Sequence, residues 1–149
     1  MQFKKSNKFW FSGVMKMEKY RVLLFSLKTK KEMETTIYAD EGETTDDIIL
    51  KVQIDDQEVC AVDTNYLPAY QKLRDKLLKM GYGIKCNGSR LNALQSGMMG
   101  ANEKIYLVKL GEQALNKDIV SLYEYAEIDE FPNTEEQIAF SQKWFNSIR

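Results

Sequence analysis

The residues best suited to bind a small anion lie between positions 85 and 100. Lys85, Ser89 and Arg90 surround an asparagine-glycine turn, and Ser96 opens a Ser-Gly-Met-Met-Gly segment downstream. Backbone amides of glycine-flanked turns can form a nest for a phosphate, which nearby basic and hydroxyl side chains strengthen. The segment matches neither the P-loop nor the dinucleotide-binding fingerprint. A nucleotide or phosphate site, a plain structural turn and a protein-contact loop are therefore all open interpretations.

Two adjacent methionines, Met98 and Met99, lie between the glycines of the same segment. They could plug the end of a sheet. If exposed, they would form an adaptable contact of the kind that flexible partner-binding sites use. Both interpretations stay open at this point.

Carboxylates are concentrated between residues 32 and 65, where eleven acidic residues face one basic residue. Asp46 and Asp47 precede a predicted strand, and Asp55 and Asp56 occupy a predicted hairpin tip. Paired acids could perform acid–base chemistry, hold a hard cation or simply solvate the surface, although the spacing fits no EF-hand. Like charges gathered on one side repel each other but steer a basic protein. We expect the fold to gather both pairs into one docking surface for a basic partner.

The sequence contains no histidine. Ser-His-Asp and Cys-His couples are therefore excluded, and a general base would have to be a carboxylate, lysine, tyrosine or cysteine. A zinc site would have to use Cys60, Cys86 and carboxylates, which is rare. We expect no metal and no cofactor. Both cysteines are predicted to be small buried residues of strands, with a reactive thiol as the alternative.

Length and composition indicate one globular domain. The chain has 149 residues, of which 44% are hydrophobic and 29% charged, as in an ordinary domain with its own core. The apolar run after three early lysines is about seven residues long and lacks a signal-peptide cleavage site. No stretch approaches the roughly 20 apolar residues of a membrane span. We predict a bacterial, cytoplasmic protein with no membrane partner, in which residues 1–16 are an accessory leader and 17–149 one α+β domain.

The first half of the domain predicts an antiparallel meander. Tyr20–Lys28 and Glu32–Ala39 are separated by a short polar turn. Ile48–Ile54 and Glu58–Val62 flank Asp-Asp-Gln, which is a hairpin signal. The apolar stripe that follows, at helical spacing, predicts a helix over 66–80 that ends at Gly81 and packs on the sheet. Its basic residues, Arg74 among them, are placed on the exposed surface.

The second half predicts a further hairpin and two helices. Tyr82–Cys86 and Ser89–Leu94 are expected to pair across an Asn-Gly type I′ turn, and Ile105–Leu110 suits a central strand. A helix is expected over Lys117–Ala126, and another after a capping box at Thr134. The aromatic stripe of that last helix could dock on the sheet or form a partner-binding ridge. The predicted fold is α+β, with a mostly antiparallel sheet of about five to seven strands, one packed helix and two C-terminal helices.

Glycines recur with polar residues between positions 66 and 125. The pattern runs through Gly81, the Cys-Asn-Gly-Ser-Arg turn at 86–90, the Ser-Gly-Met loop at 96–98, Gly100 and Tyr106. In this part the chain resembles a group of small uncharacterised bacterial proteins. The resemblance implies no activity. Ala-Leu-Gln at 93–95 departs from the aromatic residue or valine expected before the Ser-Gly-Met loop.

Charge balance also bears on the choice of partner. Residues 66–109 hold eight basic residues, two acidic ones and several tyrosines. An acidic block flanks them and the pI is about 5.6, which disfavours nucleic acid. We expect a protein-binding module, most concretely an inhibitor or immunity-type protein that blocks a basic partner through an acidic surface. The alternative is a small enzyme or a nucleotide- or phosphate-binding module centred on residues 85–100. The sequence leans away from an enzyme and does not set an oligomeric state.

Overall fold

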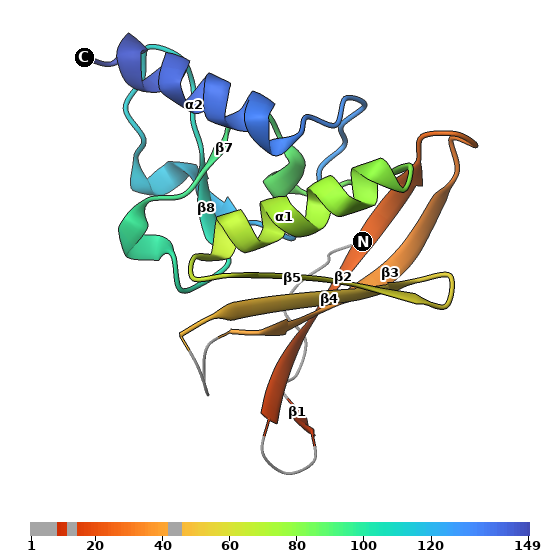
Figure 1. Ribbon diagram of the computed structural model, residues 1–149. Coiled ribbons are helices and arrows are strands. Elements are labelled where there is room, and N and C mark those ends of the chain that lie inside the picture. Colours follow the sequence, from red (N-terminus) through yellow and green to blue (C-terminus); the bar gives the residue numbers. More distant parts are fainter. Residues whose placement is uncertain (1–8, 12–14, 42–45) are drawn as a thin grey trace.

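Two antiparallel sheets and two long helices make up the part of the chain that the computed structural model describes, namely residues 9–11, 15–41 and 46–149 (Figure 1). The strands of the larger sheet are β1 (Phe9–Phe11), β2 (Met15–Ser26), β3 (Glu32–Asp40), β4 (Ile48–Ile54), β5 (Gln57–Asp63) and β6 (Tyr82–Ile84). Those of the smaller sheet are β7 (Ala93–Leu94), β8 (Lys104–Leu107) and β9 (Ile119–Ser121). The helices are α1 (Tyr66–Lys79) and α2 (Thr134–Ser147), with 3₁₀ turns η1 (Asn87–Ser89), η2 (Gly97–Met99) and η3 (Asn116–Asp118).

The larger sheet is a meander in which consecutive strands are neighbours. Its order is β1-β2-β3-β4-β5, with β6 paired to the later part of β2, and the smaller sheet has the order β7-β8-β9. Every pairing is antiparallel. The predicted α+β class with a mostly antiparallel sheet is therefore confirmed, and so is the predicted meander.

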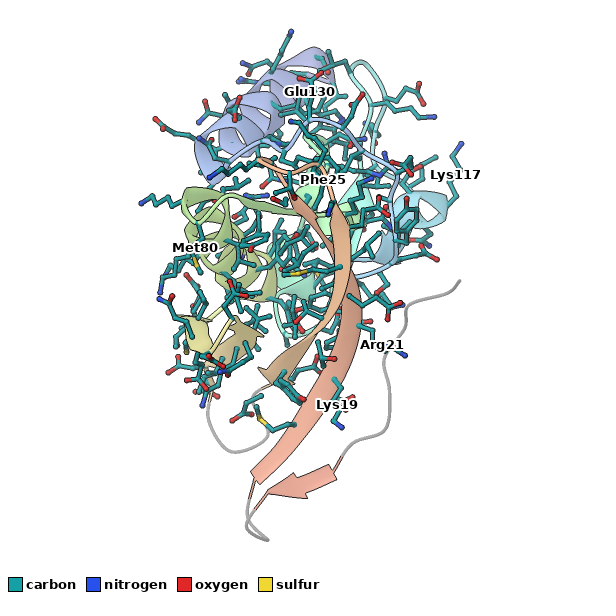
Figure 2. All side chains as sticks on the ribbon, turned by 90° about the vertical axis from the view of Figure 1, so that its right-hand side faces the viewer. Lys19, Arg21, Phe25, Met80, Lys117 and Glu130 are labelled. Atoms are coloured by element: carbon teal, nitrogen blue, oxygen red, sulfur yellow. The ribbon has the colours of Figure 1, made fainter. Side chains whose placement is uncertain are left out.

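Helix α1 covers one face of the larger sheet. Val22, Leu24, Ile37 and Leu50 are at most 1% exposed and belong to the same hydrophobic core as the buried residues of α1. Because side chains alternate along a strand, the residues between them face the other way. Figure 2 shows Lys19 and Arg21 on that opposite face of β2. One face of the sheet thus forms the core, and the other carries charged and half-buried side chains.

The predicted helix over 66–80 is confirmed as α1. Tyr66, Tyr70, Leu73 and Leu77 of its stripe are fully buried. Gly81 ends the helix with a φ of +94°, a left-handed conformation that glycine adopts without a steric penalty. The placement of Arg74 on the surface is wrong, since its side chain is fully buried. Arg74 follows Tyr70 by four residues and therefore lies on the same face of the helix.

The hairpin of β4 and β5 is also confirmed, and its turn has an unusual sequence. Ile54 pairs with Gln57, so Asp55 and Asp56 form a two-residue turn. Their φ angles are 51° and 39°. Positive φ at both positions marks a type I′ turn, which favours Asn-Gly because a β-carbon is strained there. Two adjacent aspartates hold this exposed turn at some cost in backbone strain and charge repulsion.

The predicted hairpin around Asn87-Gly88 is wrong. These residues form the 3₁₀ turn η1, and Ala93–Leu94 alone of the expected return strand is extended in a sheet. The amides of Asn87 and Gly88 donate to the carbonyls of Glu124 and Leu122 at 2.9 Å each. A β-carbon on Gly88 would lie 2.7 Å from the Leu122 side chain. The glycine is therefore required for close packing here and not for a hairpin turn.

The expected helix over Lys117–Ala126 is wrong as well. After η3 the chain extends as β9 and pairs with β8. Ile119 and Val120 are β-branched and suit a strand. One long C-terminal helix, α2, therefore stands where two were expected. Its cap is Asn133, one residue before the predicted Thr134, and Asn133 exchanges hydrogen bonds with Glu136.

A cluster of buried tyrosines joins the two sheets. Tyr123, which follows β9, stacks on Tyr20 of β2 with ring centroids 4.1 Å apart. It meets Tyr66 and Tyr70 of α1 edge-on at 6.0 and 6.1 Å. The hydroxyls of Tyr66 and Tyr123 are 3.0 Å apart, and Tyr66 also donates to Glu41 at 3.1 Å. Burial raises the pKa of all four phenols, so the cluster stays neutral.

The expected leader falls partly outside the described residues, which exclude 1–8 and 12–14. Phe9–Phe11 pair with the beginning of β2. The predicted domain boundary after residue 16 therefore lies inside β2, whose Met17 is 4% exposed. Within the described ranges, no helix has the length and apolar character needed to cross a membrane.

Replacing Asp55-Asp56 by Asn-Gly should stabilise the fold. The double variant Asp55→Asn/Asp56→Gly relieves left-handed strain and like-charge repulsion. We expect a gain of about 1 kcal/mol, which corresponds to roughly 2–4 °C in Tm for a chain of this size. Thermal and urea unfolding would measure it. The control Asp55→Ala/Asp56→Ala removes the same charges but keeps both β-carbons, and it should lower Tm. A rise in both variants would contradict the backbone argument.

Candidate binding surfaces

Lys85 does not offer a free charge to a ligand. Its side chain is buried, and Nζ donates to Glu32 at 2.7 Å and to Glu127 at 2.9 Å (side-chain oxygens Oε2 in both cases). The hydrogen bond to Glu32, followed by that to Glu127, raises the pKa of Lys85. Two carboxylates already compensate this ammonium group, so an anion would have to displace one of them.

The other three predicted ligand-binding residues lie on different surfaces. Ser89 is fully buried, and its Oγ is 2.5 Å from the Tyr70 hydroxyl. Arg90 donates from Nε to Asn87 at 3.1 Å and lines a hollow of about 340 Å³ beside Pro132. Ser96 is exposed and lines another hollow, of about 280 Å³. The structure does not bring these side chains together around one point.

The Ser-Gly-Met-Met-Gly segment and the preceding Gln95 cap the beginning of α1. The amide of Tyr66 donates to the carbonyl of Gly100 at 2.7 Å, and the amide of Leu67 donates to the Gln95 side chain at 2.8 Å. These bonds satisfy amides at the helix N-terminus that have no partner within the helix. Met99 is half-buried, whereas Met98 is 98% exposed. Of the two predicted contact residues, Met98 is therefore the one that faces solvent.

The acidic residues expected to form one docking surface lie at opposite ends of β4. Asp46 and Asp47 precede β4, and Asp55 and Asp56 follow it. A strand of 7 residues separates them, which is about 23 Å. The Debye length at physiological ionic strength is about 8 Å, so the two groups act separately. Asp63 pairs with Lys72 at 3.0 Å next to the first group, while the second group forms the hairpin tip.

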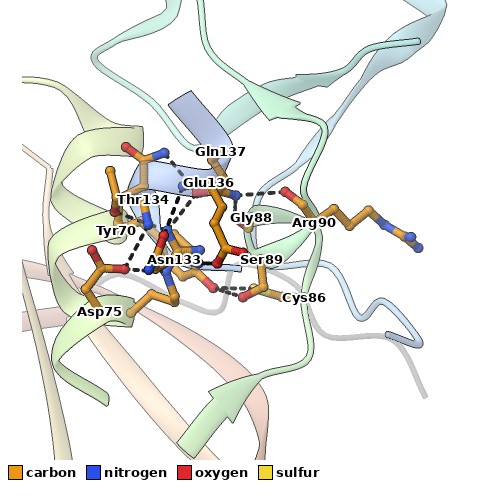
Figure 3. A network of polar contacts seen from close by, with 12 residues as sticks. Tyr70, Asp75, Cys86, Gly88, Ser89, Arg90, Asn133, Thr134, Glu136 and Gln137 are labelled. Carbon is orange, nitrogen blue, oxygen red and sulfur yellow. Dashed lines mark hydrogen bonds and ion pairs between the residues drawn. The ribbon is translucent and has the colours of Figure 1, made fainter. Parts of the chain in front are cut away.

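Gln137 connects α2 to the rest of the molecule, a role that no sequence pattern indicates beyond the capping box in which it lies. Its side chain is 1% exposed. Nε2 donates to the carbonyls of Gly88 and Arg90, at 2.9 and 2.7 Å. Oε1 accepts from Gln71 at 2.9 Å and from Arg74 at 2.6 Å. Figure 3 shows Gln137 beside Gly88 and Arg90. All its hydrogen-bonding capacity is used.

Arg74 forms the charged half of the same network. Its Nε donates to Asp75 at 2.8 Å, and its Nη2 donates to Thr134 at 3.2 Å. Its guanidinium lies 5.8 Å from the Tyr70 ring centroid. Asp75 also accepts from the amide of Thr134 at 3.2 Å. Both members of this ion pair belong to α1, and each makes a hydrogen bond to Thr134, so the pair holds the first turn of α2 against the middle of α1.

Two neighbouring hollows flank the end of β7. The first is the 280 Å³ hollow between the beginning of α1, residues 93–97 and the first half of α2. The second, of about 480 Å³, lies along the second half of α2. Leu94 and Ser141 line both. We call the two together the β7–α2 groove. Ile138 and Phe145 on its walls are 49% and 56% exposed.

The aromatic stripe of α2 divides between the core and this groove. Trp144 is 8% exposed, and its Nε1 donates to the carbonyl of Glu112 at 2.8 Å. Phe145, beside it, is largely exposed. Trp144 therefore packs against the body of the protein, as the first interpretation of the stripe expects. Phe145 stays on the surface, where the second interpretation places a partner-binding ridge.

No family model and no curated protein matches this chain. The resemblance over residues 66–125 stays a prediction. Two of its glycines have local packing roles: a β-carbon on Gly100 would lie 2.2 Å from the Asn65 side chain, and one on Gly88 would lie 2.7 Å from Leu122.

Removing the Gln137 side chain should destabilise the protein strongly. In Gln137→Leu the guanidinium of Arg74 and the carbonyls of Gly88 and Arg90 lose partners inside the core. We expect a loss of about 2–4 kcal/mol in the free energy of unfolding, measurable by urea unfolding. The matched control Gln142→Leu, on the exposed side of the same helix, should change it by less than about 0.5 kcal/mol. Similar losses in both variants would contradict the role of Gln137.

The two cysteines should differ in reactivity. Cys60 is half-exposed on β5, whereas burial raises the pKa of the fully buried Cys86 thiol. Only a thiolate reacts with iodoacetamide. At pH 8 we expect native protein to be alkylated at Cys60 alone, and unfolded protein at both cysteines, as peptide mass spectrometry would show. Equal modification of Cys86 in native protein would contradict its burial.

Proposed function

We propose that this protein is a protein-binding module of the inhibitor or immunity type, which meets a basic partner with the acidic tip of the β4–β5 hairpin. The observation that supports this most directly is the Asp55-Asp56 turn. Both residues adopt a positive φ at an exposed position where Asn-Gly would be less strained. Residues in strained backbone conformations are concentrated at functional sites. The strained aspartates of this turn, where Asn-Gly would fit more easily, therefore indicate a functional role.

The electrostatic setting of the tip favours the same conclusion. Asp55, Asp56 and Glu58 are exposed and have no ion pair within the described residues. At the other end of β4, by contrast, Asp63 is paired with Lys72. An uncompensated acidic tip attracts a basic protein over about one Debye length and speeds its association.

The contacts of residues 85–100 give less support to the alternative function, a nucleotide- or phosphate-binding module. A phosphate or nucleotide site would need Lys85 and Arg90 to converge, but Lys85 is held by two carboxylates and Arg90 lines a hollow without it. Ser89 has no exposed surface. The contacts of these residues therefore favour the protein-binding function over an anion-binding one.

The Asn-Gly variant of the turn separates binding from stability. Parent protein would first be used to capture a partner from cells that contain this protein, and association kinetics would follow at low and high salt. At low salt we expect Asp55→Asn/Asp56→Gly to slow association by about tenfold, although the same variant raises Tm. The parent rate should fall steeply with salt.

A matched control removes two carboxylates from the other end of β4. At physiological ionic strength, Asp46→Asn/Asp47→Asn should alter the association rate by less than about twofold, because these residues lie about 23 Å from the tip and the Debye length there is about 8 Å. If the Asn-Gly variant associates as fast as the parent at low salt, the acidic tip does not recognise the partner.

A further inference from the structure

The β7–α2 groove differs from the rest of the surface in its charge. Charged residues make up 29% of the chain, yet none lines either of its two hollows. Side-chain amides take their place, including Gln71, Gln95 and Gln142, beside the apolar Leu94, Ile138 and Phe145. A charged ligand that moved from water into this groove would lose its hydration and would meet no opposite charge. The chemistry of the walls therefore selects an uncharged occupant.

One edge of β7 is open to this groove. The carbonyl of Asn92 accepts from the amide of Val108 at 3.1 Å, and Leu94 pairs with Tyr106. Residues of an antiparallel strand alternate in the side to which their backbone groups point. Ala93 and Gln95 therefore point away from β8. The Ala93 carbonyl and the Gln95 amide have no hydrogen-bond partner within the described residues.

Gln71 supplies a fixed acceptor on the opposite wall. Its Nε2 donates to Gln137 at 2.9 Å, which sets the orientation of the amide. The side chain is 9% exposed and lines the groove. Its Oε1 has no hydrogen bond to a described residue and is not closed off from solvent. A buried acceptor held in this way is suited to receive a peptide N–H.

We infer that the β7–α2 groove binds an extended, uncharged peptide segment of a partner protein, which adds to β7 as a further strand. The peptide backbone pairs with Ala93 and Gln95, and one of its amides donates to Gln71. Alternate side chains of an added strand face one wall, where Leu94, Ile138 and Phe145 receive apolar groups. This inference rests on the proposed function and names a second contact surface for the same partner.

A phage-displayed library of random ten-residue peptides tests the inference without the natural partner. Selection on the parent protein should enrich uncharged sequences with apolar residues at alternate positions. Ile138→Glu places a charge on the groove wall at an exposed helix position and should weaken binding of the enriched peptide, made synthetically, by at least tenfold. The control Leu91→Glu changes a residue of similar exposure, 43%, at the hollow beside Pro132, and should change affinity by less than twofold.

Amide hydrogen exchange then shows whether the peptide is bound as a strand. The Gln95 amide should exchange at least tenfold more slowly in the complex. No enrichment, enrichment of charged peptides, equal binding by Ile138→Glu, or an unprotected Gln95 amide would each overturn the inference. Asp55→Asn/Asp56→Gly should bind the peptide as the parent does. A negative result for peptide binding in the groove is therefore distinct from a negative result for the acidic tip, because the salt-dependent kinetics test the tip separately.

Discussion

The buried guanidinium of Arg74 constrains how the elements around it can be arranged. An unpaired charge at this depth would cost several kcal/mol, so its partners must be present in the folded state. Asp75, Thr134 and Gln137 supply them, and two of these belong to the first turn of α2. That turn carries the positive end of a helix dipole, which Arg74 alone would oppose. Asp75 offsets this by accepting from the Thr134 amide. The other side of Gln137 holds the carbonyls of Gly88 and Arg90, so one charge fixes α1, α2 and η1 together.

Those parts of the fold that depend on one repeated local pattern could be predicted from the sequence. Helix α1 buries an apolar stripe at helical spacing, and β4 buries alternate residues, so apolar periodicity within each segment is sufficient to define them. Residues 87–94 and 117–126 were mispredicted because their structure is decided by contact with each other. The Asn87 and Gly88 amides bond to residues 122–124, and no local pattern reports that pairing. An Asn-Gly dipeptide predicts a hairpin only when its glycine is free to take a positive φ, and Gly88 instead makes room for Leu122.

The candidate surfaces were predictable in part. Exposure of Met98 and of the Asp-Asp turn follows from glycine-bounded and hairpin-tip positions, and both were proposed as contacts. The groove could not be foreseen, because it joins the beginning of α1, the edge of a two-residue strand and α2. Gln71 and Gln137 gave no signal either. A glutamine in a helix is ordinarily a solvated residue, and only the position of Arg74 makes these two a buried pair.

Acidic residues that are close together in the sequence lie far apart in the folded protein, for a geometric reason. The acidic segment runs along a strand, and a strand moves its two ends apart by about 3.3 Å per residue. The tip at Asp55 therefore lies one strand length from Asp63. Helix α1 begins at Tyr66 and the groove is lined from Asn65, both of which follow closely after Asp63. Tip and groove are thus about 23 Å apart along β5. A standard protein interface covers about 800 Å² on each partner, or roughly 30 Å across. The separation between tip and groove is therefore smaller than the width of one ordinary interface. In a complex that used both, long-range attraction would act at the tip and short-range, uncharged contacts would act in the groove.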